Sequence, residues 1–481
     1  MENETRSTQP SWIVCSDCDG EGKILRPPTR KARLRYKRAR QENNVDVPPP
    51  PVGRWEPCKT CASQGLVERM AANHTDGMPN FTIDSPRIAV IGGGLAGLAF
   101  ATAARHRGLQ CTVYERDEHF HQRRQGYGLT MQQASKALCR FGITELRGGI
   151  TSTKHVVHQQ DGQIVGEWGL RKWGRPEDKK EPKRQNVHIA RQALRYQLWQ
   201  TAGNENICWN HRLQQFEENE NSIKLSFQVG DKVVNTEADI VIGADGIRSQ
   251  VRNQLIGEEK TPLRYLGCIV MLGICPLEGL PESPLLDGET VFQTADGTTR
   301  IYMMPYSTTE YMWQLSYPMA EEEASKLSQL GAAALKEEAI QRCKSWHSPV
   351  SEILRATPVE LVSGYPVYDR ALLTAFDLQV SNRVTLIGDA CHPMSPFKGQ
   401  GANQALLDAL SLAGSIYKVC KGKGEGDHPF AKALAGFEAE MLERSAVKVE
   451  ASAEAAKFLH TPVAIQQGNV TRGAASKEVE I

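Results

Sequence analysis

The chain has 481 residues, room for two or three domains, and its 57 Lys and Arg nearly balance 56 Asp and Glu. This balance leaves no overall field that would favour nucleic acid or a membrane surface. The longest apolar run, residues 267–280, is interrupted by Pro276 and Glu278, so we expect no membrane span. The first residues lack the apolar core of a secretory signal, and most of the 12 cysteines are scattered singly. We therefore expect a cytoplasmic protein whose cysteines bind metal rather than form disulfides.

Two Cys-x-x-Cys pairs lie in residues 11–66, which we interpret as a separate module. The pairs are Cys15 with Cys18 and Cys58 with Cys61. Each turn can place two thiolates on one metal ion, and two turns complete a tetrahedral Zn²⁺ site. A module of about 55 residues has little core, so a structural metal would help it fold. The alternative is four free cysteines in a loosely folded tail.

The glycines after each pair resemble the CxxCxGxG repeats of DnaJ-type zinc modules, although the second repeat lacks the first glycine. The resemblance implies zinc binding, not chaperone function. Between the pairs, residues 23–40 contain nine Lys or Arg and no acid. This segment could contact a nucleic acid, an acidic protein or a membrane surface, but we favour a solvated helix that ties the module together. Residues 67–84 are polar and predict a linker.

A glycine-rich turn follows the linker. Residues 87–91 predict a short buried strand, and residues 95–107 predict a helix of small residues. Between them, Gly92 allows a tight turn, Gly94 lets the backbone approach a pyrophosphate, and Gly97 lets helix and strand pack closely. Free N–H groups at the helix N-terminus and the helix dipole favour the phosphates there.

A second strand, residues 110–114, ends at Glu115, about 20 residues after the glycines, where an acid would hold a ribose hydroxyl. The combination predicts a bound dinucleotide, and the turn alone is equally open to NAD and FAD. Residues 123–131 follow with two adjacent arginines and a glycine turn, which suit phosphate or flavin contacts or, alternatively, an exposed loop. Residues 171–185 are heavily charged and predict an exposed excursion.

Residues 188–198 predict a helix with Arg191 in its first turn, and residues 222–229 and 231–237 predict a pair of strands. A buried strand then runs into the Gly243-Ala-Asp245-Gly246 turn. Residues 255–370 alternate in a β-like way around one helix, residues 321–345, and predict an inserted sheet domain with aromatic and Met side chains for an apolar pocket.

A third glycine-containing motif follows that sheet, within residues 388–405. Helices are predicted from this motif to about Val419 and over residues 429–458, and residues 466–481 predict a disordered tail.

Three separated motifs therefore occur in order. They are the GxGxxG turn with its later acid, the run Gly243-Ala-Asp-Gly-Ile-Arg-Ser249, and the run Gly388-Asp-Ala-Cys-His-Pro-Met-Ser-Pro396 with Gly399 and Gly401. Together they resemble the FAD-dependent aromatic hydroxylases, flavoprotein monooxygenases of the para-hydroxybenzoate hydroxylase type, over residues 85–460. The run Tyr114-Glu-Arg-Asp117 and the short C-terminus look most like the tetracycline-inactivating monooxygenases within that class.

The resemblance implies an α/β fold. A Rossmann-like FAD-binding domain would comprise residues 85–254 and 371–465, including the C-terminal helices. A mixed or antiparallel substrate-domain sheet would be inserted at residues 255–370. The small zinc-knuckle-like module would precede both.

The resemblance also assigns roles. Glu115 would bind the adenosine ribose, Arg191 would reach the FAD phosphates, and Asp389 would hold the ribityl or pyrophosphate region. The helix that begins at Gly401 would point its positive end at the flavin pyrimidine edge and stabilise reduced flavin. Asp245 would serve FAD and NAD(P)H. The expected FAD contacts are Gly92, Gly94, Leu95, Ala96, Gly97, Glu115, Arg116, Arg124, Gly128, Arg191, Asp245, Gly246, Gly388, Asp389, Pro396, Gly399, Gly401, Ala402 and Asn403.

The implied reaction begins with reduction of FAD by NAD(P)H. O2 would then form a flavin C4a-hydroperoxide that hydroxylates an aromatic or enolic small molecule, such as a phenol or a polyketide-like compound. Tyr302, Tyr306, Trp313 and Gln314 could face the substrate. We assign no acid or base, and we expect a structural role for His392. The alternatives are an FAD-dependent dehydrogenase or oxidase without oxygen insertion and a zinc-stabilised, redox-sensing binding protein.

Overall fold

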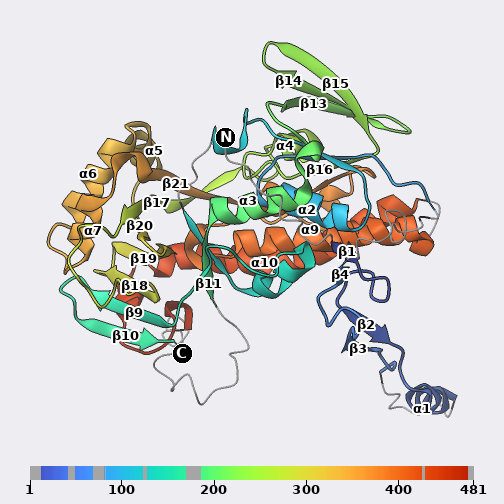
Figure 1. The fold of residues 1–481 in the computed structure, drawn as a ribbon, viewed down its shortest axis with the longest axis horizontal. Coiled ribbons are helices and arrows are strands. Elements are labelled where there is room, and N and C mark those ends of the chain that lie inside the picture. Colours follow the sequence, from blue (N-terminus) through green and yellow to red (C-terminus); the bar gives the residue numbers. More distant parts are fainter. Residues whose placement is uncertain are drawn as a thin grey trace, which may run out of the picture.

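A computed structural model describes residues 12–41, 49–68, 81, 83–122, 127–169, 186–424 and 428–474 (Figure 1). Its centre is a five-stranded parallel sheet with strand order β12-β6-β5-β16-β22. The strands are β5 (Ile88–Ile91), β6 (Cys111–Tyr114), β12 (Ile207–Cys208), β16 (Ile240–Gly243) and β22 (Val384–Leu386). The order reverses between β5 and β16, and in open α/β sheets a ligand binds at such a switch point.

The glycine turn joins β5 to α2 (Leu95–His106), as the sequence predicts. Every residue of α2 except Arg105 is buried, because α3 (Arg191–Ala202) and α9 (Gly401–Lys418) pack against it. Small side chains permit this close packing. The long helix α10 (Pro429–Phe458) packs against α9 and runs lengthwise through much of the body (Figure 1). The predicted bounds of α10 are confirmed.

A seven-stranded mixed sheet forms the second layer, with order β10-β9-β18-β19-β20-β17-β21. Helices α5 (Glu321–Gln329), α6 (Ala332–Arg342) and α7 (Val350–Ala356) cover its outer face (Figure 1). The strands are β9 (Lys154–Gln159), β10 (Ile164–Trp168), β17 (Leu263–Pro276), β18 (Thr290–Ala295), β19 (Arg300–Ser307), β20 (Glu310–Pro318) and β21 (Val362–Arg370).

Two details of this layer differ from the sequence expectation. The single helix predicted over residues 321–345 is divided into α5 and α6, because Gly331 adopts a positive φ of 86° between them. The sheet also includes β9 and β10, which the sequence division assigned to the FAD-binding segment. Strand β9 pairs in parallel with β18, a long-range pairing with no local signal in the chain.

Two smaller sheets complete the body. One has the order β7-β11-β8 and lies between the two large sheets, and the other is the antiparallel sheet β13-β14-β15, which projects at the top of Figure 1. Their strands are β7 (Gly128–Met131), β8 (Ile150–Thr151), β11 (Val187–Ala190), β13 (Arg212–Glu218), β14 (Ile223–Val229) and β15 (Lys232–Ala238). The remaining short α-helices are α4 (Gln250–Ile256) and α8 (Ala375–Leu378).

The C-terminal segment corrects one prediction. Residues 466–474, expected as part of a disordered tail, pack against β10 instead. The N–H of Gly468 donates to the carbonyl of Val165, and the N–H of Glu167 donates to the side chain of Asn469. These hydrogen bonds fix the segment along the edge strand of the seven-stranded sheet.

The N-terminal residues form a Cys-rich knuckle and an arm. Strands β1 (Trp12–Val14) and β4 (Leu66–Glu68) pair next to the body. Strands β2 (Lys23–Arg26) and β3 (Arg54–Pro57) pair farther out, and α1 (Arg30–Gln41) lies at the tip (Figure 1). The helix thus projects away from the cysteines, and the expectation that it ties the module together is wrong.

Some predictions lie outside the described residues, namely the excursion at 171–185, Arg124, and all of the linker except residues 67, 68, 81, 83 and 84. Phe81 packs edge-on against Tyr417, with ring centroids 6.1 Å apart. Among the described helices, none is both long and apolar enough to cross a bilayer.

Candidate FAD and substrate cavity

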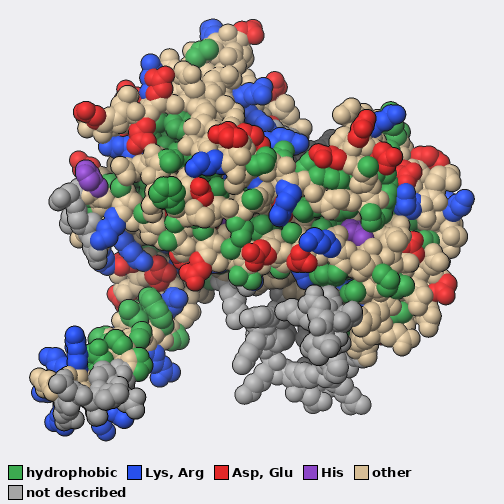
Figure 2. Space-filling model, turned by 180° about the vertical axis from the view of Figure 1, so that it is seen from behind, with side chains coloured by type: hydrophobic (Ala, Val, Ile, Leu, Met, Phe, Trp, Pro, Cys, Tyr) green, Lys and Arg blue, Asp and Glu red, His purple; other side chains and the backbone are tan. Residues whose placement is uncertain are grey.

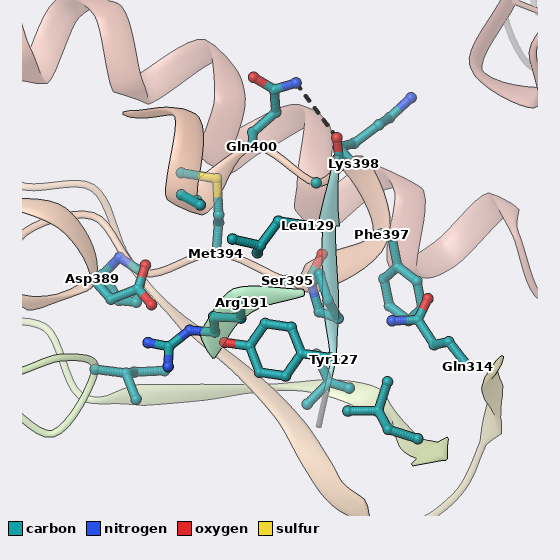
Figure 3. Close-up of a pocket in the computed structure, with 18 of the residues that line it drawn as sticks. Tyr127, Leu129, Arg191, Gln314, Asp389, Met394, Ser395, Phe397, Lys398 and Gln400 are labelled. Carbon is teal, nitrogen blue, oxygen red and sulfur yellow. Dashed lines mark hydrogen bonds between the residues drawn. The ribbon is translucent and has the colours of Figure 1, made fainter. Parts of the chain in front are cut away.

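A cavity of about 900 Å³ lies between the parallel sheet and the seven-stranded sheet. This volume is at the upper end of small-molecule sites. One wall consists of the turns after β5, β16 and β22, together with the start of α9. The opposite wall consists of side chains from β19, β20 and β21. Figure 3 shows Arg191 and Asp389 close together at one side and Phe397 facing Gln314 at the other, with Tyr127 between them.

The three glycines of the first turn lack a side chain for different steric reasons. Gly92 has a φ of 109°, and a Cβ there would lie 2.5 Å from the carbonyl oxygen of Ala244. A Cβ on Gly97 would lie 2.0 Å from the carbonyl oxygen of Gly92. Gly94 lines the cavity, and a Cβ there would meet no atom within 4 Å. Gly92 and Gly97 are therefore required by the fold itself, whereas Gly94 leaves space for something in the cavity.

In the second motif, Asp245 supports the cavity indirectly, whereas its neighbours line it. Asp245 accepts hydrogen bonds from the Ser249 hydroxyl and from the N–H groups of Gln250 at 2.7 Å and Val251 at 3.3 Å. It therefore caps α4 and does not line the cavity, and burial raises the pKa of its carboxyl group. The residues of this motif that reach the cavity are Ala244, Gly246, Ile247 and Arg248.

The third motif brings Asp389 to the cavity beside Arg191 (Figure 3). Asp389 is open to the cavity but lies deep in the protein, where desolvation raises its pKa and the nearby His392 and Arg191 oppose that shift. Beneath it, the fully buried Asp408 accepts from the Gly388 N–H at 2.9 Å and contacts the His392 Nε2 at 2.7 Å. Asp408 thereby fixes the turn that presents Asp389, and His392 is structural, as expected.

Helix α9 begins at the cavity, with Gly401 and Ala402 in the lining. The fully buried Asn403 does not reach the cavity. Its Oδ1 accepts from the N–H groups of Gln132 and Ala134, and its Nδ2 donates to the carbonyls of Thr130 and Gly399. Asn403 therefore joins α9 to strand β7 and the residues that follow it. The sequence predicts a contact with FAD for Asn403, whereas its position supports only this structural role.

The opposite wall follows the alternation of strands. Arg300, Tyr302 and Met304 of β19 face the cavity, as do Met312 and Gln314 of β20. Trp313 points the other way: its side chain is fully buried and its Nε1 donates to the Thr357 hydroxyl at 2.9 Å. The prediction that Trp313 faces the substrate is therefore wrong.

Tyr306 packs beside the Met304 and Met312 cluster without lining the cavity. Burial raises the pKa of Tyr302 to about 12, so its phenol stays protonated at neutral pH.

Arg300 is the cavity feature that sequence reasoning missed. Its side chain is 4 % exposed, and burial lowers its pKa to about 10, so it remains a cation at neutral pH. Its Nε donates to Gln293 at 2.6 Å and its Nη1 to Gln314 at 3.5 Å. Among the described residues, its side-chain hydrogen bonds go to two amides and to no carboxylate. The cavity wall thus holds a buried positive charge with neutral partners.

Two histidines on this side are uncharged. Burial lowers the pKa of His155 to about 4 and that of His188 to about 3. His155 stacks on Trp168 with ring centroids 5.5 Å apart, and His188 Nδ1 lies 3.0 Å from the Thr130 hydroxyl. They add polar but uncharged groups to the cavity lining.

The structure places the predicted FAD contacts in two groups. One group lines the cavity: Gly94, Leu95, Ala96, Gly128, Arg191, Gly246, Asp389, Pro396, Gly399, Gly401 and Ala402. The other group lies outside the lining: Gly92, Gly97, Glu115, Arg116, Asp245, Gly388 and Asn403. Glu115 accepts from the N–H groups of Gly93 at 2.6 Å and Asp117 at 3.0 Å, so it stands beside the glycine turn. Its contact with a ribose stays a prediction.

The four cysteines of the knuckle converge as the sequence predicts. All are buried, and their Sγ atoms lie within 4.8 Å of one another. Cys15 and Cys58 are 3.9 Å apart and Cys18 and Cys61 are 3.7 Å apart. Four thiolates at about 2.3 Å from one Zn²⁺ ion stand about 3.8 Å from each other. The sulfur positions therefore fit a tetrahedral metal site.

The two Cys-x-x-Cys turns of the knuckle have the same backbone conformation. The N–H of Gly22 donates to the Cys18 sulfur at 3.3 Å, and the N–H of Gly65 donates to the Cys61 sulfur at 3.2 Å. In the second half, Ser63 replaces the first glycine and still adopts a positive φ of 68°. The repeat that the sequence shows only partly is thus complete in the backbone.

The knuckle contacts the part of the body that contains the parallel sheet and its helices α2 and α9. Glu21 pairs with Lys418 at 3.0 Å and with Arg140 at 3.4 Å, and Asp19 pairs with Lys423. His106, at the end of α2, contacts the carbonyl of Trp12 through its Nδ1 at 3.1 Å. The knuckle therefore braces the end of α2 that lies away from the cavity. Since α2 has 12 residues, this end is about 18 Å from the glycine turn along the helix.

Comparison with known proteins agrees with this geometry. A family model described as FAD binding domain matches residues 86–428, and the chain belongs to that family. A 3-amino-4-hydroxybenzoate 2-monooxygenase of Streptomyces platensis is 27 % identical over 81 % of this chain and 92 % of its own length. A 6-hydroxynicotinate 3-monooxygenase of Pseudomonas fluorescens is 29 % identical over 75 % of this chain and 89 % of its own length.

Solved structures share the fold. Klebsiella pneumoniae HpxO, complexed with FAD and uric acid, superposes with a TM-score of 0.65 at 19 % identity, covering 82 % of this chain and 92 % of that one. The tetracycline destructase Tet(51) gives a TM-score of 0.58 at 19 % identity, covering 80 % of this chain and 94 % of that one. The predicted fold class and the resemblance to flavoprotein monooxygenases are confirmed, and tetracycline destructases are among the structural neighbours.

Proposed function

We propose that this protein is an FAD-dependent monooxygenase that uses NAD(P)H and O2 to hydroxylate an aromatic small molecule bearing a negative charge. The observation that carries the proposal is the cavity itself. Three cofactor motifs bound one side, and a wall of aromatic, Met and Arg side chains bounds the other. A flavin on the first wall would therefore face a substrate on the second.

The residues present fit FAD. Gly94 and Gly246 each leave open space beside the cavity, where a Cβ would meet no atom within 4 Å. The N-termini of α2 and α9 both open on the cavity, and their N–H groups and dipoles favour the pyrophosphate and the pyrimidine edge of a flavin. Arg191 would contact the phosphates, and Asp389 would hold the ribityl or pyrophosphate region. When bound, FAD supplies the redox and oxygen chemistry, which no side chain can provide.

The substrate wall supports an aromatic carboxylate bearing a hydroxyl or amino group. Arg300 offers a buried guanidinium with only amide partners, and an anionic substrate would compensate its charge. Both curated relatives cited above are named for hydroxylated aromatic carboxylates. The neutral His155 and His188 would contact the ring substituents, and the Met304 and Met312 side chains would cover the ring face and exclude water.

A substrate panel tests this function. The FAD-loaded protein is mixed with NADH or NADPH and with hydroxybenzoates, aminohydroxybenzoates or hydroxynicotinates, and their methyl esters serve as uncharged controls. We expect at least one acid to accelerate NAD(P)H consumption and to give a hydroxylated product, and its ester to be much weaker. Consumption that yields only H2O2 with every compound would instead support the oxidase alternative.

We also propose that the knuckle binds one structural Zn²⁺ ion through Cys15, Cys18, Cys58 and Cys61. The sulfur spacing and the two N–H to sulfur hydrogen bonds support it. Because the knuckle contacts the end of α2 far from the glycine turn, the metal would brace α2 rather than join the redox chemistry. Elemental analysis should give one zinc per chain, reduced by Cys18→Ser but not by Cys208→Ser outside the cluster. A zinc content near zero in purified wild-type protein would refute this proposal.

None of the twelve cysteines forms a disulfide among the described residues, and four of them are placed to bind a metal ion. We propose a reducing compartment such as the cytoplasm, in which the thiolates would stay available to the metal.

A further inference from the structure

The arm beyond the knuckle is the part of the molecule that the flavin chemistry does not use. Residues 23–57 contain ten Lys or Arg and three acids, whereas the rest of the chain contains 47 basic and 53 acidic residues. The near-neutral chain is therefore a basic arm attached to a slightly acidic body. Figures 1 and 2 show the arm projecting from the body, with cationic side chains gathered at its tip.

Helix α1 contributes nothing to a core. It has no buried residue, and seven of its 12 residues are Lys or Arg: Arg30, Lys31, Arg33, Arg35, Lys37, Arg38 and Arg40. Like charges at helical spacing, such as Lys31 with Arg35 and Arg33 with Lys37, destabilise a helix. A short, self-repelling helix without packing is marginal in water. A polyanion that neutralised these charges would stabilise it.

The charge density narrows the class of partner. Twelve helical residues span about 18 Å, which places one cation about every 2.6 Å along the axis. A nucleic acid strand carries one phosphate about every 3.4 Å. Five of the seven cations are arginines, whose planar guanidinium groups match phosphate geometry.

A membrane surface fits less well. A helix that lies on a bilayer needs a continuous apolar face. In α1 the half-buried Ala32, Tyr36 and Ala39 share one side, but their side chains are mostly small, and the exposed Leu34 lies on the other side. The helix thus lacks the large apolar face that would enter a bilayer.

The ribbon that carries α1 adds an aromatic group. Trp55 of β3 is 52 % exposed, and Lys23 lies over its ring at 4.6 Å. Its cross-strand neighbour Leu25 is equally exposed, at 51 %. Exposed aromatic side chains beside cations stack on unpaired bases, and this stacking is tolerant of sequence.

We propose that residues 23–41 and 49–57 form a binding arm for single-stranded RNA, with α1 on the phosphates and Trp55 on a base. The knuckle orients the arm through the ion pairs of Asp19 and Glu21 with the body. The arm points away from the cavity, so RNA binding and the flavin reaction occur at separate sites.

The test uses the full-length, FAD-loaded protein and fluorescence anisotropy with a labelled 20-nucleotide RNA of mixed sequence. The triple variant Arg35→Glu, Lys37→Glu and Arg38→Glu should weaken binding at least 30-fold. The matched control Arg212→Glu, Lys224→Glu and Lys232→Glu changes the net charge equally on the exposed β13-β14-β15 sheet and should weaken binding less than threefold. If four cations contact phosphates, a fourfold rise in salt lowers the affinity about 50-fold.

A second pair of variants tests stacking. Trp55→Ala should weaken binding about tenfold, and Leu25→Ala less than twofold. The proposal is overturned if the triple variant binds RNA like the wild type, or if its control loses as much. It is also overturned if phosphatidylserine vesicles or polyglutamate bind the arm more tightly than RNA does. Since α1 has no buried residue, unchanged FAD absorbance should show that each variant remains folded.

Discussion

The two walls of the cavity are built in different ways. The wall at the carboxyl ends of the parallel sheet is built on glycine turns and the first residues of α2 and α9, with the Arg191 and Asp389 side chains beside them. The wall on the seven-stranded sheet consists of side chains that project from alternate positions of its strands. The first wall suits a cofactor with a fixed shape, since backbone geometry changes little. The second wall can change its ligand by single substitutions, so it sets the specificity.

The first wall should fail under the smallest change. Gly97→Ala would place a methyl group 2.0 Å from the carbonyl oxygen of Gly92 and push α2 away from the sheet. We expect FAD affinity to fall more than 100-fold, together with a lower melting temperature, as measured by flavin fluorescence and thermal unfolding. Gly436→Ala, where a Cβ meets no atom within 4 Å on α10, should change neither.

Gly94→Ala distinguishes fold from ligand. Its Cβ meets open space, so the FAD-free protein should keep its melting temperature while FAD affinity falls about tenfold, because the methyl group would occupy the approach of the pyrophosphate. Unchanged FAD affinity in this variant would show that the phosphates do not lie on this turn.

The second wall should lose its ligand without losing FAD. Arg300→Gln removes the buried guanidinium and should raise the KM for a carboxylate substrate about 30-fold, the scale of one charged hydrogen bond of about 2 kcal/mol. FAD affinity should stay within twofold of wild type. Arg355→Gln, an exposed arginine on α7, is the control and should behave as wild type. Equal losses for acid and ester substrates would mean that Arg300 does not bind the carboxylate.

The knuckle should affect the first wall only, because it braces α2. Cys61→Ser should remove the zinc and lower the melting temperature by about 5 °C. FAD affinity should fall moderately, and KM for the substrate should not change. Cys111→Ser, in a strand of the parallel sheet outside the cluster, provides the control. A variant that loses zinc but keeps full stability would show that the brace is dispensable.

The smallest expected effect is on the stability of the protein at acidic pH. The pKa of His155 is about 4 in the fold, below its ordinary value of 6.5, so the folded state disfavours its protonated form. Its contribution to stability is complete above pH 6.5 and is lost as the pH falls from 6.5 towards 4. His155→Phe keeps the stacking on Trp168 and should reduce the loss of unfolding free energy between pH 7 and pH 5 by about 1–2 kcal/mol. Denaturant unfolding at both pH values measures it, and identical losses would contradict the assignment.

The difference between the walls also explains what could be predicted from the sequence. Backbone-lined turns require glycines at fixed spacing, so Gly92, Gly94 and Gly97 identify their turn without a structure. The two Cys-x-x-Cys pairs predict their own convergence in the same way, since a metal site would constrain residue type and spacing.

The side chains of the second wall are harder to predict from the sequence. Trp313 and Gln314 are neighbours on β20, and only the direction in which the strand faces decides which one reaches the cavity. Arg300 stands two residues before Tyr302 and therefore on the same face, so an isolated cation in an otherwise apolar strand was the available signal. Asp408 and Asn403 act through hydrogen bonds to turns distant in sequence, which no local pattern contains.

The most direct test of the account is the origin of the oxygen atom in the product. The FAD-loaded protein, NAD(P)H and the aromatic acid that best stimulates turnover are incubated under ¹⁸O2 in ordinary water, and the product is analysed by mass spectrometry. We predict one ¹⁸O atom in each hydroxylated product molecule, and none when the label is in the water instead. A product without ¹⁸O from O2, or NAD(P)H consumption matched entirely by H2O2, would contradict the assignment as a monooxygenase.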